Sequence, residues 1–212
     1  MIYIIASVIA SSLSIVFHNA IGQLLFDNHF SWTMSKVIPY VLVFLLASLT
    51  LYSSIKFVKK YGVLVGSLLF FVVIGLDFNF NRIYEGDFSN NKVIVNSTNH
   101  QIEKNALTVL AIPGCQFCHG SIDMLKILKE RNPNLTINFL ECSSDSLNLE
   151  QYIAPIDGKF NLALLEDLEE LNQLKINSFP TFIFADSKGE KSLWTNDTFG
   201  APAKDFVENN VK

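Results

Sequence analysis

Two cysteines that stand close together are the residues of this chain best suited to chemistry. Cys115 and Cys118 form a C-x-x-C motif, and Pro113-Gly114 precedes it directly. In the first turn of a helix this spacing brings both sulfurs to one side, within reach of a disulfide. The free N–H groups and partial positive charge of a helix N-terminus favour a thiolate, which is the form of cysteine that attacks disulfides. The motif therefore predicts a redox-active pair.

The order of the two cysteines predicts their roles. Cys115 follows Pro113-Gly114 and is expected at the exposed start of the helix, whereas Cys118 lies one turn deeper. We therefore expect Cys115 to attack and Cys118 to resolve the mixed disulfide that forms. His119 is expected on the flank of the same helix, with the alternative that its positive charge, when protonated, modulates a nearby thiolate.

Other uses of these residues stay open at this point. The pair is alternatively a static disulfide, and the run from Cys115 to His119 also fits the C-x-x-C-H pattern of haem attachment. A haem domain is expected to be all-helical, however, and this region predicts strands. A zinc site needs two further ligands, and the sequence has no second C-x-x-C, so we expect no metal and no cofactor. Cys142 is expected as a small buried hydrophobe, the alternative being a third redox thiol.

The elements that must position this pair follow an α/β pattern from Lys92 onward. An apolar run of strand length ends just before the motif, and a segment with helical spacing follows it. Residues 143–160 separate two further elements and resemble an insertion. The predicted strands are residues 92–95, 107–112, 135–140, 181–184 and 191–195, and the predicted helices are residues 97–104, 115–131, 161–174 and 202–211.

In this context residues 92–212 resemble the thioredoxin family. The redox motif follows a strand, Ser178-Phe179-Pro180-Thr181 opens a later strand, and Phe199-Gly200-Ala201 comes after it. The resemblance implies a thioredoxin fold, a mixed sheet flanked by helices, with Cys115 and Cys118 as the catalytic residues. It also implies a cis Phe179–Pro180 bond opposite the disulfide, with these two residues positioning the substrate.

Two positions depart from the pattern of that family. Gly114 precedes the motif where many thioredoxins have tryptophan. Val109 stands where many have a buried acid that helps to move the proton of the resolving thiol, and no acid occurs from residue 106 to 114. The missing acid keeps open a second class of function, a thioredoxin-like binding module that docks a partner without significant turnover.

The first third of the chain is nearly free of charge. The charged residues before Leu76 are few, and long apolar runs separate them. About 20 apolar residues suffice to span a bilayer as a helix. We therefore predict a transmembrane anchor in residues 1–80, with about three helices near residues 2–26, 37–55 and 61–76. His18, Asn19 and Gln23 in the first run are expected at the interface or in interhelical hydrogen bonds.

The lysines of the anchor predict its orientation. Lys56, Lys59 and Lys60 lie between the second and third runs, and loops rich in lysine stay in the cytoplasm. A polar linker, residues 81–91, then leads to the redox domain, residues 92–212, on the extracytoplasmic side of a bacterial inner or plasma membrane. The net charge of -4 does not indicate the basic surface that a nucleic-acid-binding protein needs, so we expect no nucleic-acid partner.

Together these features predict an extracytoplasmic thiol–disulfide oxidoreductase that is integral to the membrane. Its expected partners are the thiols and disulfides of exported proteins, a redox partner protein and the lipid bilayer. The resemblance leaves the direction of electron flow open, because the pair between the cysteines tunes the redox potential in the thioredoxin family and is here Gln116-Phe117, neither Gly-Pro nor Pro-His.

Overall fold

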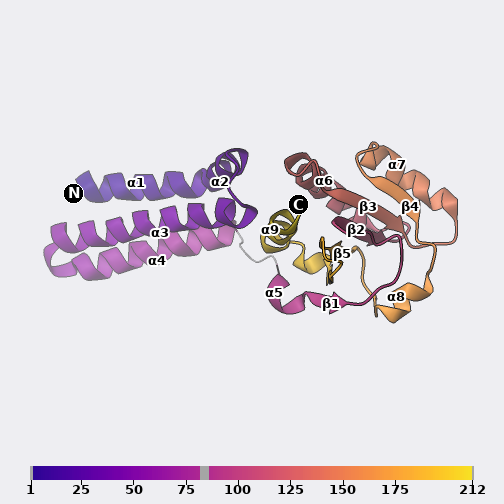
Figure 1. The fold of residues 1–212 in the computed structure, drawn as a ribbon. Helices are drawn as coiled ribbons and strands as arrows, with labels where there is room; N and C mark the ends of the chain where they lie inside the picture. The colour runs from indigo at the N-terminus through magenta and orange to yellow at the C-terminus, as the bar shows by residue number, and fades with distance from the viewer. Residues whose placement is uncertain (1, 82–85, 212) are drawn as a thin grey trace. The chain divides into compact units, whose positions relative to one another are not determined.

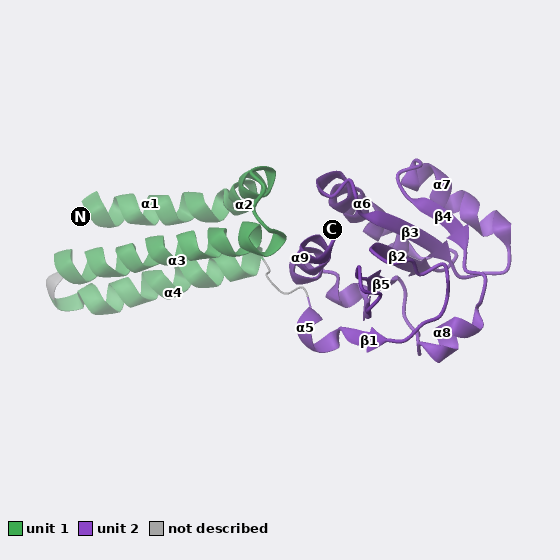
Figure 2. Ribbon diagram, viewed as in Figure 1, with its two compact units in different colours: residues 1–84 green, residues 85–212 purple. Residues whose placement is uncertain are grey.

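A computed structural model describes residues 2–81 and 86–211, apart from the side chain of Lys59. The chain divides into two compact units, residues 1–84 and residues 85–212 (Figures 1 and 2). The first unit is helical and the second combines strands with helices.

Four α-helices make up the described part of the first unit. They are α1 (Ile2–Val16), α2 (His18–Asp27), α3 (Trp32–Phe57) and α4 (Gly62–Phe80), with a short 3-10 helix, η1 (Lys59–Tyr61), before α4. The first apolar run was expected as one helix, but it breaks at Phe17, where α1 and α2 are bent by 62°. Among the described residues, α3 and α4 are each long and apolar enough to cross a membrane, and the bent pair adds a third span if it counts as one.

This helical unit hides small polar side chains and exposes apolar ones. Ser7, Ser11 and Ser14 on α1 are buried, and the hydroxyl groups of Ser7 and Ser11 donate to backbone carbonyls of their own helix at 2.9 Å. Many large apolar side chains of the same helix are exposed, among them Ile2, Ile5, Ile9, Leu13 and Val16. In water such an arrangement is unfavourable, whereas small and polar residues between helices and apolar residues outside suit a bundle in lipid.

A buried polar pair joins two helices of this unit. Nδ1 of His18, on α2, lies 3.0 Å from Oδ1 of Asp77, on α4, and both side chains are buried. The side-chain amide of Asn81 also donates to Asp77 at 2.8 Å, and the ring of Tyr40 meets the imidazole edge-on at 4.3 Å. The interhelical hydrogen bond expected of His18 is therefore confirmed, while Gln23 bonds within its own helix, to Asp27.

A six-stranded mixed sheet forms the centre of the second unit. Its strands are β1 (Val93–Val95), β2 (Ala106–Ala111), β3 (Thr136–Glu141), β4 (Asn161–Leu164), β5 (Thr181–Ala185) and β6 (Lys191–Thr195), in the order β1-β6-β5-β2-β3-β4. Strand β2 is parallel to β3 and antiparallel to β5, and all six of its residues are buried. The predicted mixed sheet flanked by helices is confirmed, and the topology is that of a thioredoxin fold.

Helices cover both faces of this sheet. On one face lie α6 (Gln116–Arg131), α7 (Glu150–Ile156) and α9 (Ala201–Asn210). Arg131 of α6 pairs with Glu208 of α9 at 2.8 Å, and the ring of His119 on α6 stacks on Tyr152 of α7. The other face packs on α8 (Glu169–Gln173) and the turn after it, through the buried cluster of Ile102, Leu110, Leu140, Leu165 and Ile183.

Two predicted helices are wrong. Residues 161–164 form β4 instead, because they pair in parallel with Asn138–Glu141 at the sheet edge, and only Glu169–Gln173 is helical. Leucines at every third position therefore did not mark one buried face: Leu165 is buried, but Leu168 is exposed. Residues 97–104 form no helix, since Ser97 and Asn99 use their side chains to bond backbone N–H groups two residues further on.

The segment expected as an insertion has a clear place in the fold. It is the crossover between the parallel strands β3 and β4, and it contains a 3-10 helix, η2 (Ser146–Leu149), followed by α7. Parallel neighbours need such a connection because they cannot be joined by a tight hairpin. Residues 82–85 of the predicted linker lie outside the described residues. Further along the predicted linker, α5 (Phe88–Asn91) is a short helix. Its Phe88 is buried against Trp194 and Phe206 of the second unit.

Candidate functional site: a disulfide at the start of helix α6

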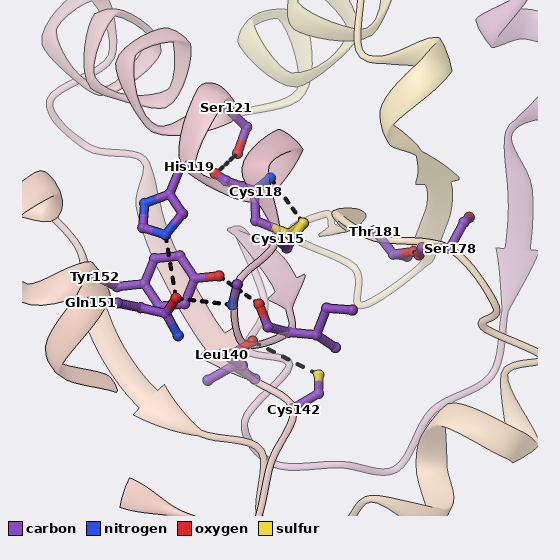
Figure 3. Close-up of a disulfide and its surroundings, with 12 residues drawn as sticks. Cys115, Cys118, His119, Ser121, Leu140, Cys142, Gln151, Tyr152, Ser178 and Thr181 are labelled. Carbon is purple, nitrogen blue, oxygen red and sulfur yellow. Dashed lines mark hydrogen bonds between the residues drawn. A yellow bond between two sulfur atoms is a disulfide. The ribbon is translucent and has the colours of Figure 1, made fainter. Parts of the chain in front are cut away.

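The two cysteines of the C-x-x-C motif form a disulfide at the start of α6 (Figure 3). Cys115 is the N-cap residue, and its sulfur accepts a hydrogen bond from the backbone N–H of Cys118 at 3.1 Å. Gly114 just before it has φ +69°, a left-handed conformation that glycine adopts without steric cost. The chain can therefore turn sharply out of β2 and begin a helix whose first free N–H groups face a sulfur.

The two sulfurs differ in their access to solvent. Cys118 is completely buried, whereas Cys115 is partly exposed. Phe117, between them, is 70% exposed beside a groove of about 300 Å³ that Gly120, Met124 and Phe199 also line. The exposed ring of Phe117 therefore offers a partner an apolar contact close to the partly exposed Cys115, while Cys118 is reachable only from within the protein.

The segment Phe179–Pro180 lies at the start of β5. The peptide bond between these two residues is cis, as predicted. Thr181, which follows, pairs with Leu110 of β2, so the segment enters the sheet beside the strand that leads to the redox motif. Pro180 is buried, and Phe179 packs partly buried against the cluster beneath β2 and β3. The sheet thus places Phe179 and Pro180 at the same end of the fold as the disulfide.

His119 lies on the flank of α6 and faces α7. Its ring stacks on that of Tyr152 with centroids 4.6 Å apart, and its Nε2 is 3.5 Å from Oε1 of Gln151. Figure 3 shows the imidazole pointing toward these two residues. The sequence predicted the position on the flank of α6 but not these two neighbours.

A buried acid that the sequence did not predict lies at the end of β3. Glu141 is fully buried, Ser143 donates to one of its carboxyl oxygens at 2.6 Å, and the other oxygen has no hydrogen-bond partner within the described part of the chain. Burial raises the pKa of this carboxyl above its ordinary value, and the bond from Ser143 opposes that shift. Glu141 pairs across the sheet with Ala111, four residues before Cys115, whereas the family position, Val109, is a buried apolar residue.

Cys142, the third cysteine, is a poor nucleophile in this structure. Burial and the neighbouring Glu141 raise the pKa of its thiol to about 12. Its sulfur packs partly buried against the cluster that contains Phe179. These surroundings match the expectation of a small hydrophobe rather than a third redox thiol.

No cluster of three or more His, Cys, Asp or Glu side chains that could hold a metal ion occurs within residues 2–81 and 86–211. The six-stranded sheet also differs from the all-helical domain that the haem interpretation requires. The mixed sheet and the disulfide at the start of α6 define the second unit as thioredoxin-like.

Comparison with solved structures gives likenesses to thiol–disulfide oxidoreductases. A secreted disulfide oxidoreductase of Mycobacterium tuberculosis, described as homologous to E. coli DsbE, has 18% identity over 51% of this chain and 81% of its own, with a TM-score of 0.41. The thioredoxin domain of a thiol-disulfide oxidoreductase from Bacteroides vulgatus has 20% identity over 57% and 94%, with a TM-score of 0.43.

A third likeness is a putative thiol:disulfide interchange protein DsbE from Chlorobium tepidum, with 10% identity over 57% and 90% of the two chains and a TM-score of 0.44. No protein-family model matches the chain, and a sequence search of curated proteins finds no significant match. The assignment of the fold accordingly rests on the strand order and pairing described above.

Proposed function

We propose that this protein is a membrane-anchored thiol–disulfide oxidoreductase whose redox unit, residues 92–212, acts on exported proteins outside the cytoplasm. The observation that carries the proposal is the Cys115–Cys118 disulfide at the start of α6, with one sulfur accessible and the other buried. The anchor is residues 1–80, and its apolar exterior supports a position in the bilayer. The three lysines near η1 favour a cytoplasmic side for that loop.

The chemistry follows from the two cysteines alone. In the reduced protein the Cys115 thiolate attacks a client disulfide, forms a mixed disulfide with one client sulfur and releases the other as a thiolate. Cys118 then loses its proton, attacks the Cys115 sulfur and releases the second client thiolate. The client has gained two electrons and the centre has become the disulfide. The reverse sequence oxidises a client dithiol, and the reduction potentials of the centre and its partner set the direction.

Phe179 and Pro180 are proposed to position the client. A polypeptide that reaches Cys115 meets the exposed Phe117 on α6 and the segment before β5, which enters the sheet beside β2. Such a surface suits an extended, apolar stretch of client around its cysteine. A redox partner protein must return the centre to its starting state after each turnover.

Trapping of mixed disulfides tests the division of labour between the two thiols. In the full-length protein Cys118→Ala should accumulate mixed disulfides with client proteins, seen as bands on a gel that a reductant removes, because the resolving thiol is absent. Cys115→Ala should accumulate few, since the remaining thiol is buried. Equal trapping by both variants would contradict the assignment of Cys115 as the nucleophile.

The same experiment distinguishes the oxidoreductase from the alternative function, a binding module. A thioredoxin-like binding module docks its partner without turnover, and the apolar Val109 at the family's acid position favours it. If neither variant traps a client and the wild-type protein exchanges no thiols with a model disulfide, the binding module is the better description.

A further inference from the structure

Helix α7 holds the backbone that leads into the redox motif. Oε1 of Gln151 accepts a hydrogen bond from the backbone N–H of Gly114 at 3.0 Å. The hydroxyl of Tyr152, the next residue, donates to the carbonyl oxygen of Ile112 at 2.7 Å. Two consecutive residues of the β3–β4 crossover thus fix the residues one and three positions before Cys115.

The same two residues contact the chain just after the motif. The ring of Tyr152 stacks on that of His119, which follows Cys118 directly, with an interplanar angle of 23°. Oε1 of Gln151 also lies 3.5 Å from Nε2 of His119. One short helix therefore touches both flanks of the four-residue redox turn, as Figure 3 shows.

These contacts are well defined by their surroundings. The side-chain N–H of Gln151 donates to the carbonyl oxygen of Asn148 at 2.9 Å, which directs Oε1 toward Gly114. Tyr152 is completely buried and packs on Phe139 of β3. Burial and the nearby Glu141 and Cys142 raise the pKa of its hydroxyl to about 12, so the hydroxyl remains a hydrogen-bond donor at physiological pH.

We propose that Gln151 and Tyr152 are positioning residues that stabilise the disulfide form of the Cys115–Cys118 centre by holding both flanks of its turn. To close the disulfide, the two sulfurs must meet, and the turn loses conformational freedom. A turn that is already held loses less, so the effective concentration of one thiol at the other is higher. The proposal rests on the proposed function, since it concerns the potential at which that centre exchanges electrons.

The equilibrium to measure is the reduction of the centre by dithiothreitol. The Sγ–Sγ bond of the protein breaks, each cysteine gains one electron and one proton, and dithiothreitol loses two of each as it closes its own cyclic disulfide. At equilibrium the ratio of disulfide to dithiol protein, against a known ratio of oxidised to reduced dithiothreitol, gives the stability of the protein disulfide.

The test uses the full-length protein in detergent with three single variants. Gln151→Met removes the acceptor oxygen at similar length, Tyr152→Phe removes the hydroxyl but keeps the stacked ring, and Gln173→Met makes the first change at an exposed site on α8. The equilibrium constant for disulfide formation should fall about two- to tenfold in each of the first two, as expected for one net hydrogen bond. It should stay at the wild-type value in Gln173→Met.

A fourth variant and a stability control separate this role from a general loss of structure. Gln151→Glu keeps an acceptor oxygen, so its equilibrium constant should lie closer to the wild type than that of Gln151→Met. Thermal unfolding of each variant shows whether it is folded. If Gln151→Met does not fold, Tyr152→Phe decides, because it leaves the buried ring in place.

The proposal is overturned if Gln151→Met folds and has the same equilibrium constant as the control Gln173→Met. If Gln151→Met does not fold, the proposal is overturned when Tyr152→Phe has the same equilibrium constant as the control. This measurement involves dithiothreitol alone and no client protein. A shifted equilibrium together with failed client trapping would therefore count against the proposed action on exported proteins and leave the role of α7 standing. Client trapping together with an unshifted equilibrium would support the proposed function and refute the role of α7.

Discussion

The backbone N–H of Cys118 lies 3.1 Å from the sulfur of Cys115, in the only turn of α6 whose N–H groups have no carbonyl partner within the helix. A thiolate at Cys115 would accept this bond more strongly than a thiol, because hydrogen bonds to charged acceptors are stronger. The same unit contains Cys142, whose thiol has a pKa of about 12. The three cysteines should therefore differ widely in reactivity.

Alkylation of the reduced, full-length protein measures that difference. With iodoacetamide near neutral pH, Cys115 should be modified first, whereas Cys142 should react on the order of a thousandfold more slowly than an ordinary exposed thiol, because its thiolate is that much rarer. Mass spectrometry of the digested protein identifies each modified cysteine. Unfolding in denaturant should abolish the protection of Cys142, and rapid labelling of Cys142 in the folded protein would contradict its assignment as a buried hydrophobe.

Glu141 should make the fold less stable as the pH rises. Its pKa is raised in the folded state, so between the ordinary and the raised value the folded protein binds more protons than the unfolded one. Stability is then fully present below the ordinary pKa and falls as the pH rises toward the folded one. Glu141→Gln, which cannot ionise, should be more stable than the wild type at pH 8 and should lose that advantage near pH 4.

Denaturant unfolding of both proteins across this pH range measures the effect. Glu150→Gln is the matched control, because Glu150 is an exposed carboxyl on α7 and should give the pH profile of the wild type. Parallel profiles for Glu141→Gln and the wild type would show that the buried carboxyl has an ordinary pKa.

Two glycines of α4 should differ sharply in their tolerance of a larger side chain. A Cβ at Gly66 would lie 2.9 Å from side-chain atoms of Leu51 and Ser54 on α3, whereas a Cβ at Gly75 would meet nothing within 4 Å. Small residues let membrane helices approach closely. Gly66→Leu should therefore separate α3 from α4 and lower the thermal stability in detergent, and Gly75→Leu should leave it nearly unchanged. Equal melting temperatures would argue against the close α3–α4 contact at Gly66.

Reporter fusions test the orientation of the anchor. A reporter that is active only outside the cytoplasm should be active when fused after Lys212 and inactive when fused within residues 56–60, because lysine-rich loops remain inside. Replacing Lys56, Lys59 and Lys60 by glutamine should weaken this preference. The reverse pattern of activity would place the redox centre in a reducing compartment, where disulfides are rare.

Features that depend on neighbouring residues could be predicted from the amino-acid sequence. The i, i+3 cysteines after Pro113-Gly114 predicted a helix start with a disulfide, and the short apolar runs predicted five of the six strands. The apolar composition of the first third likewise predicted helices of membrane-spanning length. Each of these signals is local, since turn chemistry, hydrophobic period and run length are properties of a few consecutive residues.

Features that depend on residues far apart in the chain became visible in the folded protein alone. Residues 161–164 are a strand because β3 offers them an open edge, although their leucine spacing favoured a helix. Glu141 is buried because its strand lies beside β2, and Gln151 reaches Gly114 because the crossover folds α7 back over the same end of the sheet. Pairing and burial between distant segments override local propensity, so no spacing along the chain reveals them.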